Sequence, residues 1–87
     1  MGKRKVSHKK QDLTRDIIAL CNNFETWSPR YKKDVIYDIE NDLHSYFVEI
    51  DDQDVDVVIM EGTSGKYLRT DPDKTAENYL LKLPDCT

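Results

Sequence analysis

Residues 54–70 carry the pattern of a β-hairpin, which constrains the fold more than any other feature of the sequence. Val55, Val57 and Ile59 are apolar and alternate with Asp54, Asp56 and Val58. This alternation is the signature of a strand with one buried face. The loop at 61–65 contains two glycines, as a hairpin turn requires, and residues 66–70 form the returning strand. The sequence therefore predicts an antiparallel sheet.

A helix is predicted to begin at Ser28 and to end within residues 41–45. Ser28 is a good N-cap, and proline at the next position suits the first turn of a helix. An apolar stripe with helical spacing follows: Tyr31, Val35, Ile36, Ile39 and Leu43. The charged residues of the segment, Asp38 among them, are expected on the face exposed to water. A further strand is predicted at 46–50, which is aromatic and β-branched.

The segment from Leu13 to Cys21 fits two patterns. Its apolar residues are spaced as on one face of a helix, but residues 17–21 are also an apolar run of strand length. The pattern alone slightly favours the helix, but we predict the strand, which the family resemblance described below favours. After the hairpin, residues 75–78 are expected to form a turn, and the leucines between residues 80 and 83 to pack back onto the domain.

Positive charge is concentrated at the start of the chain, where five cations occur without an acid: Lys3, Arg4, Lys5, Lys9 and Lys10. The whole chain has a net charge of −4, so residues 1–10 carry +5 and residues 11–87 carry −9. We predict a flexible basic arm at 1–12 and a single domain at 13–87. The alternative for the arm is that its isolated apolar residue, Val6, anchors a short edge strand.

The predicted elements define an α+β fold. We expect a small antiparallel sheet of about four strands, with one main helix packed on one face and the flexible basic arm at the N-terminus. A chain of 87 residues buries roughly 60–65% of its unfolded surface, which is enough for one modest core.

The two cysteines, Cys21 and Cys86, are fewer than small secreted scaffolds usually carry. We interpret them as reduced thiols of a cytoplasmic protein, with a terminal disulfide as the alternative. No apolar stretch approaches the ~18 residues that cross a bilayer. The basic start leads to no apolar segment of a signal peptide. We therefore expect a cytoplasmic location and no membrane partner.

Two segments near the C-terminus are specific enough to indicate a family: Lys66-Tyr67-Leu68-Arg69-Thr70-Asp71-Pro72-Asp73 and Asn78-Tyr79-Leu80-Leu81-Lys82-Leu83-Pro84-Asp85-Cys86. With the Trp27-Ser28 helix start, they resemble the bacterial domain-of-unknown-function family 3892, whose members share a Tyr-Leu-Arg-Thr…Asp segment and an Asn-Asn-Leu…Leu-Pro-x-Cys close. The resemblance covers residues 16–86, and Tyr79 departs from the second Asn. It implies a small compact α+β domain and no activity, cofactor or partner.

Tyr67 and Arg69 are the first candidates for a ligand-binding site, because alternate residues of a strand share one face. A tyrosine beside an arginine can stack on a base or hold a phosphate or carboxylate. Asp71, Asp73 and Asn78 are included in this candidate site. We favour a structural alternative, an ion pair from Arg69 to Asp71 or Asp73 that ties the last loop to the sheet.

Metal binding and catalysis are not indicated. The acidic run from Asp52 to Asp56 has the opening spacing of an EF-hand loop, but Val57 stands where glycine is needed and Thr63 where glutamate is needed. The histidines and cysteines lack the spacing of a zinc site. We predict no metal, no cofactor and no enzymatic activity.

These observations favour a small cytoplasmic binding or accessory module that engages a protein or a small anionic ligand. Contact is expected by strand addition at an open sheet edge or through the face of Tyr67 and Arg69. The alternative is nucleic-acid binding through the basic arm, whose cations could neutralise phosphates. The acidic remainder of the chain would repel a duplex pressed onto it.

Overall fold

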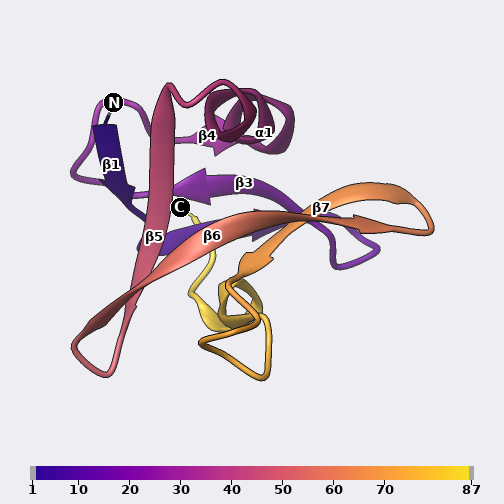
Figure 1. The fold of residues 1–87 in the computed structure, drawn as a ribbon. Coiled ribbons are helices and arrows are strands. Elements are labelled where there is room, and N and C mark those ends of the chain that lie inside the picture. The colour runs from indigo at the N-terminus through magenta and orange to yellow at the C-terminus, as the bar shows by residue number, and fades with distance from the viewer. Residues whose placement is uncertain (1, 87) are drawn as a thin grey trace.

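Seven strands, one α-helix and one short 3-10 helix form the fold of residues 2–86, the part of the chain that the computed structural model describes (Figure 1). One sheet has the strand order β1 (Gly2–Lys5), β5 (His44–Ile50), β6 (Gln53–Gly62), β7 (Gly65–Thr70). The other has the order β2 (His8–Gln11), β3 (Ile17–Cys21), β4 (Arg30–Tyr31). Helix α1 spans Lys32–Glu40, and the 3-10 helix η1 spans Tyr79–Lys82. The α+β description holds in outline, but the strands form two sheets instead of one.

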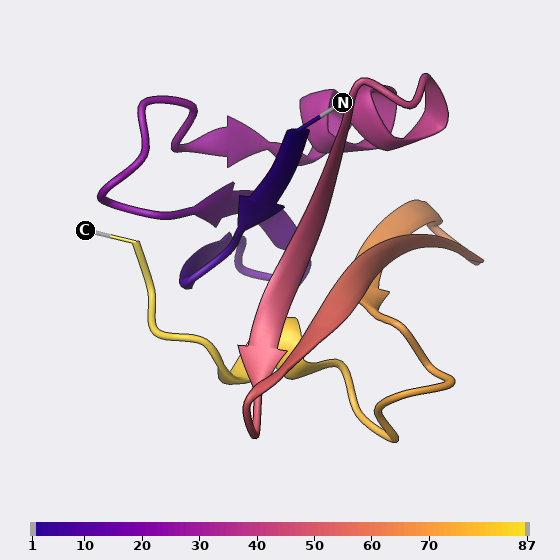
Figure 2. The ribbon, with the colours of Figure 1, turned by 60° about the vertical axis from the view of Figure 1, so that its left-hand side comes forward.

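The N-terminal segment joins the two sheets, so the prediction of a flexible arm at 1–12 is wrong for the described residues. Strand β1 pairs parallel with β5, and β2 pairs antiparallel with β3. The chain changes sheet between Val6 and Ser7. Val6 N donates to Phe47 O at 2.8 Å, and Ser7 N donates to Cys21 O at 2.9 Å. Val6 is 2% exposed, so its burial anchors a segment whose other residues are mostly polar. Figure 2 shows β1 alongside β5.

The ambiguous segment before residue 22 forms a strand, as predicted. Strand β3 is the central strand of its sheet, and four of its five residues are buried. Burial on both faces explains why the run is continuously apolar. Leu13, the first residue of the alternative helical stripe, lies fully exposed in the loop before β3.

Helix α1 begins three residues later than the sequence predicts, because its N-cap is Tyr31 instead of Ser28 and its first residue is Lys32. The Ser28 hydroxyl accepts a hydrogen bond from Asn22 N at 2.9 Å, so it stabilises the loop before β4 instead of capping the helix. The predicted apolar face is correct at its centre, because Val35 is buried and Ile36 and Ile39 pack against the core. Tyr31 and Leu43, at the two ends of the stripe, are 49% and 46% exposed.

The predicted hairpin of β6 and β7 is present, and β5 forms a second hairpin with β6. Strands β5 and β6 are joined through Asp51 and Asp52, whose φ angles of 51° and 65° are those of the tight hairpin turn. Strands β6 and β7 are closed by the pair Gly62 and Gly65, with residues 63–64 between them. The aspartates of β6 at 54 and 56 are exposed, as expected for the wet face of a strand.

The C-terminal segment is bound to β2 and β3. Cys21 and Cys86 form a disulfide with a Cα–Cα distance of 6.2 Å, so the interpretation of reduced thiols is wrong and the alternative disulfide is present. Lys9 N donates to Pro84 O at 3.0 Å, and Cys86 N donates to Lys9 O at 2.8 Å. These bonds place the last described residues alongside β2.

The core draws side chains from both sheets, α1 and η1: Val6, Ile17, Leu20, Val35, Tyr46, Val48, Val55, Val57, Leu68 and Leu80. Leu80 is fully buried and Leu83 packs against this cluster, whereas Leu81 is 42% exposed. The core therefore fixes the position of the C-terminal segment and of the loops around β7.

Candidate functional site

Most of the N-terminal cations are paired with acids of the body. The N···O distances are 3.3 Å for Lys3–Asp54, 3.6 Å for Arg4–Asp38, 3.4 Å for Lys5–Glu49 and 2.5 Å for Lys9–Asp85. Lys10 is exposed and forms no ion pair among residues 2–86. Because β1 lies against β5 and β5 against β6, the basic residues of β1 lie close to acidic residues of β5 and β6. The charge asymmetry along the chain is therefore largely cancelled in the fold.

Arg69 is engaged with the loop that follows β7, although not as predicted. Its Nε donates to Thr70 O at 2.8 Å, and its Nη2 donates to Thr75 O at 3.2 Å. No ion pair from Arg69 to Asp71 or Asp73 is present in the described residues, so that prediction is wrong in its partners. Asp71 Oδ1 instead accepts from Asp73 N at 2.9 Å. Arg69 thus ties the last loop to the sheet through backbone carbonyls, whereas the bond between Asp71 and Asp73 lies within that loop.

Asn78 covers the outer edge of β7. Its Nδ2 donates to Leu68 O at 3.0 Å, and its Oδ1 accepts from Thr70 N at 3.3 Å and Leu80 N at 3.1 Å. The amide side chain thus replaces part of a neighbouring strand and also caps η1. The buried Thr70 hydroxyl adds contacts to Thr75 Oγ1 at 2.8 Å and Tyr79 N at 3.1 Å. Capped in this way, the β7 edge is a poor acceptor for strand addition.

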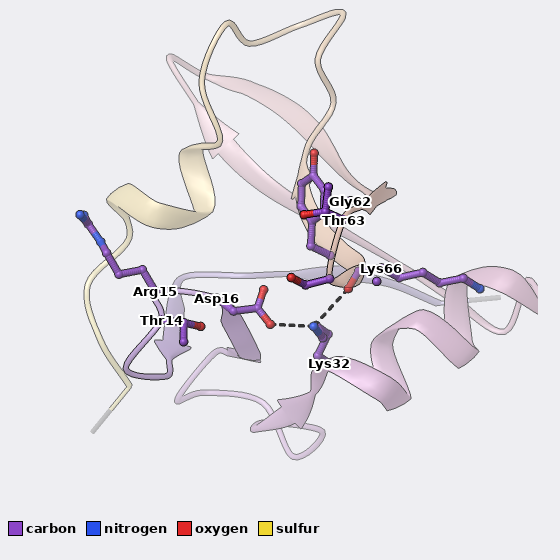
Figure 3. Close-up of a pocket in the computed structure, with 10 residues that line it drawn as sticks. Thr14, Arg15, Asp16, Lys32, Gly62, Thr63 and Lys66 are labelled. Carbon is purple, nitrogen blue, oxygen red and sulfur yellow. Dashed lines mark hydrogen bonds and ion pairs between the residues drawn. The ribbon is translucent and has the colours of Figure 1, made fainter.

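Tyr67 faces a different surface, where it lines a pocket beside the β6–β7 hairpin. This pocket has a volume of about 440 Å³ and is bounded by the β2–β3 loop, the first residue of α1 and the β6–β7 hairpin (Figure 3). Its lining residues are Thr14, Arg15, Asp16, Lys32, Gly62, Thr63, Ser64, Gly65, Lys66 and Tyr67. Of the predicted ligand-binding residues, the pocket contains Tyr67 alone.

Lys32 lies at the centre of this pocket. Its Nζ donates to Asp16 Oδ2 at 2.7 Å and to Lys66 O at 3.1 Å, and Figure 3 shows both contacts. Lys32 therefore links the β2–β3 loop to β7 from the start of the helix. The Lys66 side chain extends in another direction, toward α1, where its Nζ contacts Glu40 Oε2 at 2.5 Å. The hydrogen bond and charge of Glu40 raise the pKa of Lys66, so Lys66 is a cation at neutral pH.

The β2–β3 loop is shaped by Asp12. Its Oδ1 accepts from Thr14 Oγ1 at 2.6 Å, Thr14 N at 2.8 Å and Asp16 N at 3.1 Å. The bond from the Thr14 hydroxyl is the main reason that the pKa of Asp12 lies below its ordinary value. Arg15 has a φ of 70° at the end of this turn, and its carbonyl accepts from Gln11 Nε2 at 3.0 Å. The turn places two consecutive residues, Arg15 and Asp16, at the wall of the pocket.

The pocket could not be assembled from the sequence, because residues 14–16, 32 and 62–67 meet only through tertiary structure. The three segments belong to a loop, a helix start and a hairpin. A weak local signal existed in the loop, where Asp12 precedes Thr14 as in turns stabilised by an aspartate side chain.

A second polar cluster is buried around Asp38, which the sequence analysis placed on the wet face of the helix. The Asp38 side chain is 1% exposed. Arg30 Nε donates to Oδ2 and Arg30 Nη2 to Oδ1, both at 2.9 Å, and the Tyr46 hydroxyl donates to Oδ2 at 2.5 Å. The missed signal was its spacing, since Asp38 lies three residues after the buried Val35 and on the same helical face.

Arg4 completes the Asp38 cluster from β1. Its Nη1 donates to the Tyr46 hydroxyl at 2.8 Å, and its guanidinium lies 5.5 Å from the centre of the Trp27 ring. Burial opposes ionisation of Asp38, but the hydrogen bonds from Arg30 and Tyr46 outweigh it and hold the pKa of Asp38 below 3.8. Burial and the bond to Asp38 raise the pKa of Tyr46. This cluster joins β1, β4, α1 and β5, and leaves little room for a ligand.

Within residues 2–86, no group of three or more histidine, cysteine, aspartate or glutamate side chains is arranged to hold a metal ion. Among the described helices, none is long and apolar enough to cross a membrane.

A model of the family described as "Protein of unknown function (DUF3892)" matches residues 4–84. The comparisons with curated proteins and with solved structures gave no match. The family match spans nearly the whole chain, including the Arg4 of the buried cluster, the pocket residues and the Asn78 cap. The chain therefore belongs to the DUF3892 family of proteins of unknown function.

Proposed function

We propose that the protein is a small non-catalytic binding module that takes a small anionic ligand, such as a carboxylate or a phosphate ester, in the pocket around Lys32. The observation that carries the proposal is the charge of this pocket. Two cations, Arg15 and Lys32, are available to an anion there against one acid, Asp16, whereas the ammonium group of Lys66 is paired with Glu40 outside the pocket. The pocket also has a volume typical of small-molecule sites.

The binding mode follows from the contacts of Lys32. An anion that enters the pocket competes with Asp16 for the Lys32 ammonium group, which is held at 2.7 Å from that carboxylate. The Arg15 side chain extends away from Lys32 (Figure 3). Because it is long and exposed, it can turn toward the same anion. Hydroxyl groups of Thr63 and Ser64 line the same space and can donate hydrogen bonds.

A small anion is favoured over the other partners expected from the sequence. Strand addition at β7 would have to displace Asn78, which already occupies Leu68 O and Thr70 N. Nucleic-acid binding through the N-terminal segment would have to break ion pairs such as Lys3–Asp54 and Lys5–Glu49. The proposed location remains the cytoplasm, although the Cys21–Cys86 disulfide is more typical of an oxidising compartment.

The test is a titration of the full chain with inorganic phosphate, citrate and adenosine monophosphate at low ionic strength, followed by backbone amide NMR. Amide shifts are expected in residues 14–16 and 62–66. Lys32→Gln should weaken binding about tenfold, because a charge-assisted hydrogen bond contributes about 1.5–3 kcal/mol. Lys33→Gln is the matched control, since Lys33 is exposed on α1 and does not line the pocket.

Two results would overturn the proposal. One is the absence of saturable shifts at these residues with every anion at millimolar concentration. The other is equal weakening by Lys32→Gln and Lys33→Gln, which would show a general charge effect. A parallel titration with single-stranded RNA and DNA addresses the nucleic-acid alternative. Shifts confined to residues 3–10 would support that alternative against the pocket.

A further inference from the structure

A second depression lies against the Cys21–Cys86 disulfide, away from the Lys32 pocket. It has a volume of about 270 Å³ and is lined by both cysteines together with Lys10, Asn23, Glu25, Ser28 and Pro29. Cys21 is 1% exposed at the end of β3, whereas Cys86 is half-buried. The disulfide is therefore open to a small molecule from one side, and Cys86 is its more accessible sulfur.

Two charged side chains, Lys10 and Glu25, line this depression. Lys10 is exposed, and no ion pair engages it in residues 2–86. Glu25 is the one acid among the lining residues, and it is exposed and also free of ion pairs in the described chain. A positive charge beside a disulfide attracts an anionic thiol and stabilises the thiolates that form during exchange. Lys10 can supply that charge.

Breaking the disulfide would leave the C-terminal segment with few attachments. Residues 84–86 are held to β2 by the Lys9–Pro84 and Cys86–Lys9 backbone hydrogen bonds and by the Lys9–Asp85 ion pair. The core cluster contains no residue beyond Leu80, and Leu83 packs at its margin. Release of residues 84–86 therefore leaves the core and the Lys32 pocket in place.

From these observations we propose that the disulfide is a thiol–disulfide exchange site for a small anionic thiol, attacked at Cys86. The thiolate of the small molecule bonds to Cys86 Sγ as the Cys21–Cys86 bond breaks. The electron pair leaves on Cys21 Sγ, which takes a proton from water. A second molecule of thiol attacks the mixed disulfide and releases the Cys86 thiolate. The net change is two thiols oxidised to one small-molecule disulfide and the protein reduced to its dithiol form.

The test uses the full oxidised chain with reduced glutathione as the anionic thiol and 2-mercaptoethanol as the neutral one. Samples are quenched with an alkylating agent and the modified cysteine is located by peptide mass spectrometry. We expect the first glutathione adduct on Cys86 and a rate proportional to thiol concentration. Amide NMR of the reduced protein should differ from the oxidised form near residues 9–10, 21 and 84–86 and agree elsewhere.

Lys10→Gln should slow the reaction with glutathione about threefold, the order expected from removing one nearby surface charge, and leave the reaction with 2-mercaptoethanol unchanged. Lys74→Gln is the matched control, because Lys74 is exposed in the loop after β7 and does not line this depression. A rate that becomes independent of thiol concentration would overturn the proposal, since it would mean that unfolding exposes the disulfide. A first adduct on Cys21, or equal effects of the two lysine variants, would do the same.

Discussion

Asp38→Asn is the substitution that most directly tests the buried polar cluster. It keeps the volume of the side chain and removes its negative charge. Both carboxylate oxygens accept hydrogen bonds, Oδ1 from Arg30 Nη2 and Oδ2 from Arg30 Nε and the Tyr46 hydroxyl. An asparagine has one oxygen and one NH₂ group, so its NH₂ must face one of these donors. Two arginines also lose their buried counter-charge.

The expected loss follows from the burial of the partners. Removing one member of a buried ion pair costs about 3–5 kcal/mol, because a charge is left uncompensated. The side chains of Arg4 and Arg30 are 19% and 34% exposed and can be partly solvated, so the lower end applies. We expect Asp38→Asn to lower the free energy of unfolding by about 3 kcal/mol. For a small domain this corresponds to a fall of about 2–3 M in the urea midpoint.

Urea denaturation followed by the fluorescence of Trp27 measures this loss, because that ring packs edge-on against Tyr46 with centroids 5.7 Å apart. Asp56→Asn is the matched control. Asp56 is exposed on β6 and its side chain forms no ion pair in residues 2–86, so a change within about 0.5 kcal/mol is expected. A loss below about 1 kcal/mol for Asp38→Asn would refute the reasoning, since it would mean that water or another donor replaces the cluster.

Three further outcomes are expected from the same structure. The pKa of Asp38 is held below 3.8, so its contribution to the free energy of unfolding is fully present above pH 3.8 and is lost as the pH falls through the lowered pKa. Thermal midpoints measured from roughly pH 6 to pH 2 should therefore fall, and they should fall less steeply in Asp38→Asn. Asn78→Ala should lower the free energy of unfolding by about 2 kcal/mol, because the Leu68 carbonyl and the Thr70 amide lose their partner, and calorimetry showing an unchanged melting temperature would contradict this. Cys86→Ser should lower it by at most about 4 kcal/mol, the loop-entropy value for a separation of 65 residues, and urea titrations of the oxidised wild type and the variant measure the difference.

The sequence predicted the parts of the fold that depend on local pattern. The strand from Val55 to Ile59 and its hairpin were recognised because alternate burial and two glycines are local features. The strand at 17–21 was chosen on the family resemblance, because its apolar pattern alone slightly favoured a helix. The helix start was misplaced because Ser28 and Pro29 have the residue types of a helix N-terminus, but the Ser28 hydroxyl is used by Asn22. Capping preference is a local property, and a tertiary contact overrode it.

The candidate site was less predictable, because it depends on which segments meet. Tyr67 was singled out by strand periodicity and does line the pocket, but the Lys32 and Asp16 that it accompanies come from other elements. Arg69 and Asn78 come from the two segments that indicated the family, and both serve the loop after β7. In this chain, therefore, a distinctive sequence segment serves to close the fold, although it was interpreted as a binding site.

The basic N-terminal segment shows why charge segregation in a sequence is a weak guide to a polyanion partner. A run of five cations without an acid is typical of a mobile, solvated arm, and strand-forming residues are scarce in it. Parallel pairing of β1 with β5 nevertheless sets Lys5 opposite Phe47 in register, and Lys5 Nζ then reaches Glu49, two residues further along β5. Lys3 reaches Asp54 on β6 from the same strand. Exposed pairs of this kind contribute less than about 1 kcal/mol each, so they do not explain why the segment folds. The segment folds because Val6 is buried and Arg4 contacts Tyr46 and Asp38. The lysines of the same segment are thereby placed next to acidic residues.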